Sequence, residues 1–130
     1  KKNKTKILGV TILTSFNSSQ TKKYYNNQNV NQLVKKFAIN AKKNNLDGIV
    51  CSPLEIATVR KEVGNKMLIV VPGIRLGGVN PNKKDDQKRI LTPKQAINLG
   101  ADYLVIGRPI VESNNPLKTI KKINKSIIEK

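Results

Sequence analysis

The stretch MLIVVPGIR, from Met67 to Arg75, decides the fold that this sequence predicts. Its first five residues are all apolar, and three of them are β-branched. A short continuous apolar run of this kind is typical of a strand in a parallel sheet that is covered on both faces. Three further runs have the same character and are expected to be strands: Ile7–Leu13, Gly48–Cys51 and Tyr103–Ile106.

Helical patterns separate these strands. The segments SPLE at 52–55 and TPKQ at 92–95 are capping boxes with proline at the first helical position, and Gly64 and Gly100 are placed to end the two helices. Two more helices are predicted from apolar residues at helical spacing. The first runs to about Lys43 with Val30, Leu33, Val34, Phe37, Ala38 and Ala41 on its inner face, and the second begins at Asn115-Pro116 with Leu117, Ile120, Ile123 and Ile127.

Four βα units in succession fit two α/β architectures, a small doubly wound sheet or half of a (β/α)8 TIM barrel. A complete barrel needs about 250 residues. A chain of 130 residues could therefore supply only half of one. Two longer polar segments, 14–29 and 72–91, interrupt the otherwise short connections.

The net charge of +17 raises the question of nucleic-acid binding. The excess comes from 21 lysines against only four arginines, while lysine, asparagine and isoleucine together fill 52 of the 130 positions. These three residues share AT-rich codons. Proteins that bind nucleic acids use arginine on base edges and aromatic rings for stacking, and both are scarce in this chain. We therefore interpret the charge as a solvated surface with a mutational bias and expect no nucleic-acid partner.

Other classes of function are excluded by what the chain lacks. One cysteine and no histidine leave no disulfide framework, no structural zinc site and no Ser-His-Asp triad. Cys51 is expected to be buried and inert. The apolar runs are much shorter than the ~20 residues of a membrane span, and no signal peptide is recognisable, so a cytoplasmic protein is expected. The chain starts at Lys1 without an initiator methionine, which indicates a processed, trimmed or partial sequence.

Residues that follow the predicted strands are the candidates for function, because parallel α/β folds bind ligands at the carboxyl ends of their strands. Two consecutive strands are followed by glycine and arginine, as Gly73-Ile74-Arg75 and Gly107-Arg108. Glycine lets a backbone N–H approach an anion closely, and the arginine fork matches phosphate oxygens. In barrels, phosphate sites frequently follow strands seven and eight. Turn glycines and solvated arginines are the alternative interpretation of these residues.

Several motifs together resemble one enzyme family. They are VPGIR at 71–75, DQKRI at 86–90, TP at 92–93 and GADYLVIGRPI at 100–110, with VTILTS at 10–15 and DGIVCS at 47–52 upstream. In this order they resemble bacterial orotidine 5′-phosphate decarboxylases along essentially the whole chain. The spacing of residues 86–89 argues against a related sugar-phosphate decarboxylase.

The resemblance implies a (β/α)8 barrel that converts orotidine 5′-phosphate (OMP) to uridine 5′-phosphate (UMP) and carbon dioxide in pyrimidine biosynthesis. It implies a homodimer that needs no metal and no organic cofactor. Residues 72–91 would form the loop that closes over the phosphate. Substrate-binding residues are implied at Thr14, Arg75, Gln87, Gly107 and Arg108, with Ser15 near the pyrimidine amide.

One part of the family pattern is missing. The family's catalytic Asp-x-Lys-x-x-Asp array occurs nowhere in this sequence. Residues 1–130 are therefore expected to be the C-terminal half of a single barrel domain, about its last four βα units, with no catalytic residue of its own and no activity alone. The alternative is a non-catalytic basic module that binds phosphorylated ligands or nucleic acid.

Overall fold

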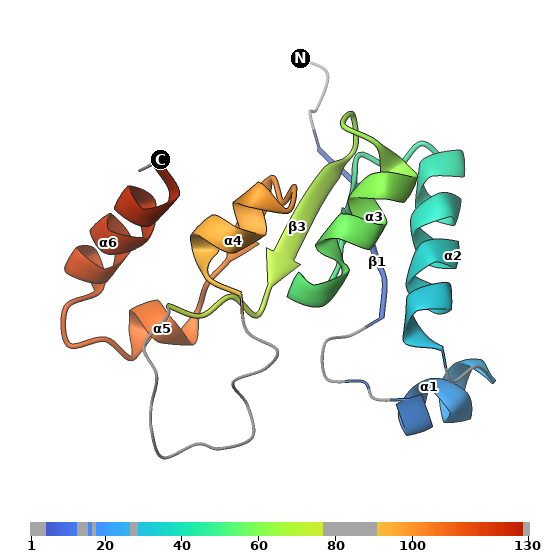
Figure 1. The fold of residues 1–130 in the computed structure, drawn as a ribbon, viewed down its shortest axis with the longest axis horizontal. Helices are drawn as coiled ribbons and strands as arrows, with labels where there is room; N and C mark the ends of the chain where they lie inside the picture. Colours follow the sequence, from blue (N-terminus) through green and yellow to red (C-terminus); the bar gives the residue numbers. More distant parts are fainter. Residues whose placement is uncertain (1–4, 13–15, 17, 27–28, 77–90, 129–130) are drawn as a thin grey trace.

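The computed structural model describes residues 5–12, 16, 18–26, 29–76 and 91–128, and it contains one parallel sheet (Figure 1). The strands are β1 (Leu8–Val10), β2 (Gly48–Val50), β3 (Leu68–Pro72) and β4 (Tyr103–Val105). They lie side by side in the order of the sequence, and each neighbouring pair is parallel. All four strands were predicted. The starts of β2 and β4 coincide with the prediction, and the other described ends differ by one residue, whereas the predicted end of the first strand at Leu13 lies outside the described residues.

Helices follow each strand. They are α1 (Ser18–Tyr25), α2 (Val30–Lys43), α3 (Ile56–Val63, preceded by the 3-10 turn η1 at Pro53–Glu55), α4 (Pro93–Asn98), α5 (Arg108–Val111) and α6 (Pro116–Ile128). Both predicted capping boxes are present, at Ser52 and Thr92. The short helices α1 and α5 were not predicted. Within the described residues, no helix has the length and the apolar character needed to cross a bilayer.

The hydrophobic core lies between the sheet and the helices α2, α3 and α4. Ile49, Ile69 and Val71 point from the strands toward this layer and are almost completely buried. Val34 and Ala38 of α2, Ile56 and Val59 of α3 and Ala96 of α4 are buried against them. Helix α6 is more exposed than predicted, because Leu117 remains 73% accessible and only Ile123 is buried.

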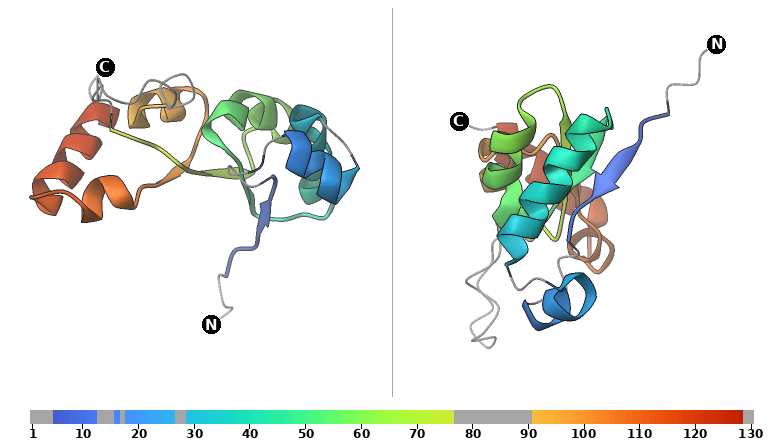
Figure 2. Two further views of the ribbon diagram at one scale, coloured as in Figure 1. Left: turned by 90° about the horizontal axis from the view of Figure 1, so that it is seen from below. Right: turned by 90° about the vertical axis from the view of Figure 1, so that its right-hand side faces the viewer.

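Among the described residues, the side chains on the opposite face of the sheet are more exposed, as expected for half of a barrel, although the strand pattern alone favoured a sheet covered on both faces. Register places Leu8 and Val10 of β1, Val50 and Val70 of the central strands, and Tyr103 and Val105 of β4 on this face. The two edge strands are the most open, with Val10, Tyr103 and Val105 between 54% and 58% exposed. We call this set the open face. In Figure 2, β1 lies at one margin of the molecule with α2 beside it.

The sheet is held at its amino end by Arg60, which the sequence analysis did not single out. The Arg60 guanidinium donates to the carbonyl oxygens of Gly64 (2.7 Å), Met67 (2.9 Å) and Gly100 (Nε, 3.0 Å). It also forms an ion pair with Asp102, whose carboxylate accepts the N–H of Ile69 at 2.7 Å. One side chain thereby joins the end of α3, the start of β3 and the turn between α4 and β4.

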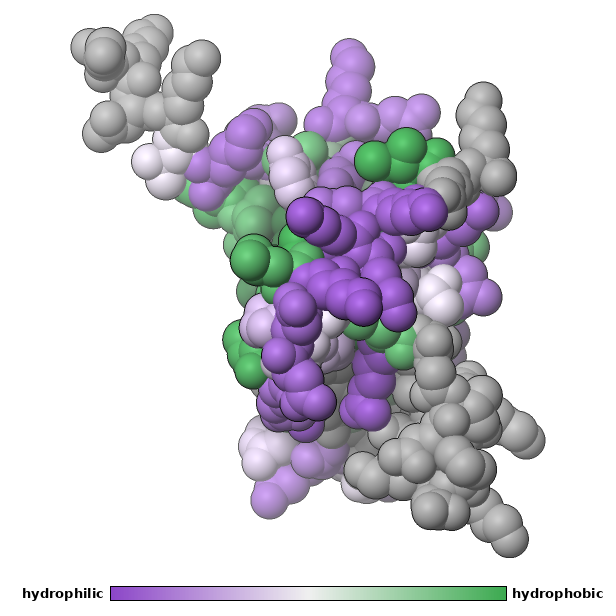
Figure 3. All heavy atoms as spheres, turned by 90° about the vertical axis from the view of Figure 1, so that its left-hand side faces the viewer, coloured by the Kyte–Doolittle hydropathy of each residue, from purple (hydrophilic) through white to green (hydrophobic). Residues whose placement is uncertain are grey.

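The outer surface agrees with the lysine-rich composition. Seen from the side of α6, it is largely hydrophilic with separate apolar patches (Figure 3). The exposed apolar residues of α6 are Leu117, Ile120 and Ile128. Most of the described lysines lie on exposed helix surfaces.

Candidate functional site

The candidate site lies at the carboxyl ends of β3 and β4. Pro72, the last residue of β3, is in register with Val105, the last residue of β4. The segments that follow these two strands therefore begin next to each other, at the carboxyl end of the sheet. Both segments contain the glycine and arginine residues predicted to bind phosphate.

The segment after β3 has a turn that requires glycine. Gly73 has φ +78°, a conformation that costs a residue with a side chain about 1 kcal/mol or more. Ile74 is buried in the core, whereas Arg75 is exposed. The Arg75 N–H donates to the carbonyl of Leu91 at 3.4 Å, so that the backbone on both sides of residues 77–90 is joined at Arg75.

The segment after β4 leads directly into α5. Gly107 precedes the helix, and its carbonyl accepts the N–H groups of Ile110 (2.8 Å) and Val111 (3.1 Å). A Cβ added to Gly107 would meet no atom within 4 Å, so the space beside this residue is open. Arg108 is the first helical residue and is exposed. Two exposed cations thus follow two adjacent strands, at the edge where a ligand would enter.

The remaining predicted substrate residues, Thr14 and Gln87, lie outside the described residues, and so does Ser15. Of the five predicted positions, the structure describes Arg75, Gly107 and Arg108, which follow the adjacent strands β3 and β4.

The end of β2 contributes a buried, uncharged thiol and a buried carboxyl group. Glu55 accepts the Ser52 N–H at 3.1 Å in the capping box. Burial raises the pKa of Glu55, and the hydrogen bonds from Ser52 lower it only in part. Burial, followed by the nearby Glu55 charge, raises the pKa of Cys51 to about 12. The thiol is therefore protonated at neutral pH and is not a nucleophile.

The reactivity of Cys51 can be tested directly. We expect the native chain to react with a thiol reagent at pH 7.5 at least 100 times more slowly than the urea-unfolded chain, because the thiol is both buried and protonated. Absorbance of the released aromatic thiolate measures both rates. Equal rates in the folded and unfolded chain would contradict the assignment.

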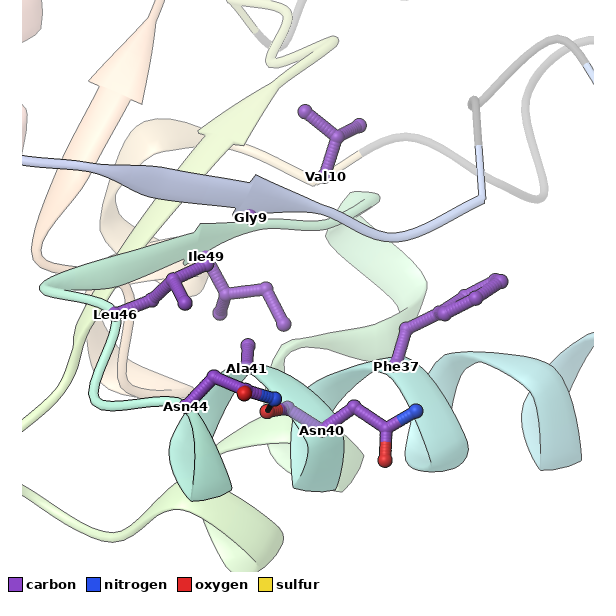
Figure 4. Close-up of a pocket in the computed structure, with 8 residues that line it drawn as sticks. All are labelled: Gly9, Val10, Phe37, Asn40, Ala41, Asn44, Leu46 and Ile49. Carbon is purple, nitrogen blue, oxygen red and sulfur yellow. Dashed lines mark hydrogen bonds between the residues drawn. The ribbon is translucent and has the colours of Figure 1, made fainter.

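One pocket lies away from this site, between β1 and α2 (Figure 4). Its volume is about 250 Å³, and its lining is mostly apolar: Gly9, Val10, Phe37, Asn40, Ala41, Asn44, Leu46 and Ile49. Figure 4 shows Ile49 directed toward α2 and Val10 directed away from it. The pocket lies beside β1, which pairs only with β2 in the described part of the chain, and contains none of the residues that follow β3 and β4.

Sequential parallel strands, each followed by a helix, with cations after two adjacent strands, define a protein of the (β/α)-barrel class. The chain belongs to the orotidine 5′-phosphate decarboxylase / HUMPS family, whose model matches residues 1–123. The prediction of four βα units of a TIM barrel is thereby confirmed.

Relatives and solved structures agree with this assignment. The orotidine 5′-phosphate decarboxylase of Coxiella burnetii (strain RSA 493 / Nine Mile phase I) is 47% identical over 126 residues, which are 97% of this chain and 52% of the relative. That of Wolbachia sp. subsp. Brugia malayi (strain TRS) is 47% identical over 98% of this chain and 55% of the relative. The chain spans about half the length of these curated relatives.

Among solved structures, orotidine 5′-phosphate decarboxylase from Lactobacillus acidophilus matches with a TM-score of 0.77 and 32% identity, over 95% of this chain and 50% of that chain. The enzyme of the same name from Pyrococcus horikoshii OT3 has a TM-score of 0.71 at 23% identity, over 96% and 52%, and supports the fold alone.

Proposed function

We propose that this chain is the phosphate-binding, C-terminal half of an orotidine 5′-phosphate decarboxylase, which converts OMP to UMP and carbon dioxide. The observation that carries the proposal is the placement of Arg75 and the Gly107-Arg108 pair after adjacent strands at one edge of the sheet. Relatives with 47% identity bear the decarboxylase name.

Arg75 and Arg108 supply the positive charge for the phosphate, and Gly107 leaves room for its oxygens. Charge-assisted hydrogen bonds from guanidinium groups to phosphate are short, strong and often bidentate. Thr14 and Gln87 remain predicted substrate contacts outside the described residues. The absence of a metal or organic cofactor, the homodimer of the complete enzyme and a cytoplasmic location also remain predictions.

The decarboxylation requires more than a phosphate-binding site. Loss of carbon dioxide from OMP leaves a carbanion that must be stabilised and then protonated, which needs a positioned acid. Binding of the distant phosphate can orient the pyrimidine for this step but cannot deliver a proton. We therefore expect the chain alone to bind UMP without turning over OMP, and measurable carbon dioxide release by the purified chain would contradict this part of the proposal.

The phosphate site is tested by UMP binding in a calorimeter. We expect Arg75→Ala and Arg108→Ala each to weaken UMP binding by roughly 10- to 100-fold, since each removes a charge-assisted bond of about 1.5–3 kcal/mol. Lys118→Ala, a change of an exposed cation on α6, is the matched control and should leave the affinity unchanged.

The same variants discriminate the alternative function. If all three variants bind UMP as tightly as the unchanged chain, the assignment of Arg75 and Arg108 to the phosphate site is wrong. DNA binding that depends steeply on salt and is indifferent to Arg75 and Arg108 would instead favour the basic nucleic-acid module.

A further inference from the structure

A second pocket lies at the amino end of the sheet, at the opposite end of the strands from Arg75 and Arg108. Residues from the turns that follow α2 and α3 line it, together with residues from the segments that lead into β1 and β3. In Figure 1 both turns lie at the top of the molecule, and β3 points away from them. The volume of this amino-end pocket is about 640 Å³, which is a typical size for a small-molecule site.

Three lysines from separate segments line the amino-end pocket. Lys6 precedes β1, Lys42 lies in the last turn of α2, and Lys66 precedes β3. All three residues are exposed, so their ammonium groups are accessible from solvent. Within the described part of the chain, none of them forms an ion pair with a carboxylate. The pocket therefore holds three positive charges that no acidic side chain among these residues neutralises.

One carboxylate lies among the described lining residues, and it already has a hydrogen-bond donor. Asp47 accepts the N–H of Ile7 at 2.8 Å, which joins the segments that lead into β1 and β2. Three lysines against this one aspartate leave the lining with a net charge of +2. Asn45 and Asn65 add side-chain amides that can donate hydrogen bonds to an anion. The lining thus offers donors and positive charge together.

The ends of the helices account for only one of the three cations. A lysine in the last turn of a helix interacts favourably with the helix dipole and with the last carbonyl groups. Lys42 does so, because its Nζ donates to the carbonyl of Glu62, near the end of α3, at 3.1 Å. Lys6 and Lys66 belong to no helix, so capping does not explain their position beside Lys42.

We infer that the amino-end pocket binds a small polyphosphate anion, a ligand with two or more linked phosphate groups. An ammonium group binds phosphate as a point charge with three donors, so separate lysines suit a ligand whose negative charges are spread over several phosphates. The pocket shares no residue with Arg75, Gly107 and Arg108. A ligand held there can therefore be bound together with UMP, and the inference does not rest on the proposed function.

The test is calorimetric titration of the 130-residue chain with inorganic tripolyphosphate and, separately, with ATP. Salt at about 0.15 M screens the general attraction of the basic surface for anions. We expect each probe to bind at one site, since both carry the linked phosphates. Lys6→Gln, Lys42→Gln and Lys66→Gln should each weaken binding by roughly fivefold or more, because each removes one charge-assisted contact.

Lys118→Gln is the matched control, since Lys118 is an exposed cation on α6 and does not line the pocket. It should leave the affinity for both probes unchanged. The three pocket variants should bind UMP as the unchanged chain does, which separates this result from the test of the phosphate site.

Three results would overturn the inference. They are no binding of tripolyphosphate, displacement of tripolyphosphate by UMP, and a loss of affinity in Lys118→Gln as large as that in the pocket variants. The last result would mean that the probes bind to the lysine-rich surface as a whole. Binding of ATP without binding of tripolyphosphate would also contradict recognition through the phosphates.

Discussion

Replacing Arg60 by alanine is expected to lower the free energy of unfolding by about 3 kcal/mol. The guanidinium satisfies the carbonyls of Gly64, Met67 and Gly100 and pairs with Asp102. Without it, these acceptors lose their donors in a region where the Arg60 side chain is only 17% exposed. An unsatisfied buried acceptor costs about 1–3 kcal/mol, and partial access of water to Asp102 reduces the total.

Urea unfolding followed by circular dichroism measures this loss. Lys61→Ala is the control, because Lys61 is the next residue of α3 and is exposed. Arg60→Lys should recover only a small part of the lost free energy of unfolding. A single ammonium group cannot donate to all of the carbonyls that the planar guanidinium contacts from its separate nitrogen atoms. Full stability of Arg60→Lys would show that charge alone, and not the fork, holds these turns.

Gly48→Ala is expected to cost about 2 kcal/mol, because the added methyl group would collide with residues of the neighbouring strands β1 and β3. A Cβ at Gly48 would lie 2.6 Å from Leu8 Cδ2, 2.8 Å from the Leu68 carbonyl oxygen and 2.9 Å from Leu68 Cβ. The Leu8 methyl group can rotate away. The Leu68 backbone is held in the ladder between β2 and β3, so relief requires a shift of the strands.

Gly9→Ala provides the comparison on the adjacent strand. Its Cβ would meet Leu46 Cδ2 at 2.9 Å, the end of a flexible side chain, and Ala41 Cβ at 3.4 Å. We therefore expect a cost below about 1 kcal/mol for Gly9→Ala. Midpoints of thermal and urea unfolding measure both variants. Equal losses at the two positions would mean that backbone contact at Gly48 is not the cause.

The elements that the sequence predicts well are those with local signals. The capping boxes fixed the starts of η1–α3 and α4, and the apolar spacing identified α2 to its last residue, Lys43. Helix α1 has no such apolar stripe in its sequence SSQTKKYY. One of its contacts is made with a residue that precedes the helix, because Phe16 stacks on Tyr24 with ring centroids 5.6 Å apart.

Features that depend on distant residues could not be predicted. Arg60 donates a hydrogen bond to the carbonyl of Gly100, which is 40 positions further along the chain, and no pattern in the neighbouring sequence predicts that contact. The exposure of the open face followed from the expectation of half a barrel and not from the strand pattern, because a continuous apolar run is the same whether a helix layer or the opposite wall of a barrel covers it. The glycine and arginine residues that follow β3 and β4 are visible in the local sequence, so Arg75, Gly107 and Arg108 could be proposed from it.

The sequential order of the strands has a consequence for how such a chain can evolve. Among the described residues, each strand pairs only with its neighbours in the sequence, so the described connections join strands that are already adjacent. A gene cut between two units therefore yields pieces that are each continuous in space, and neither must be threaded through the other to rejoin.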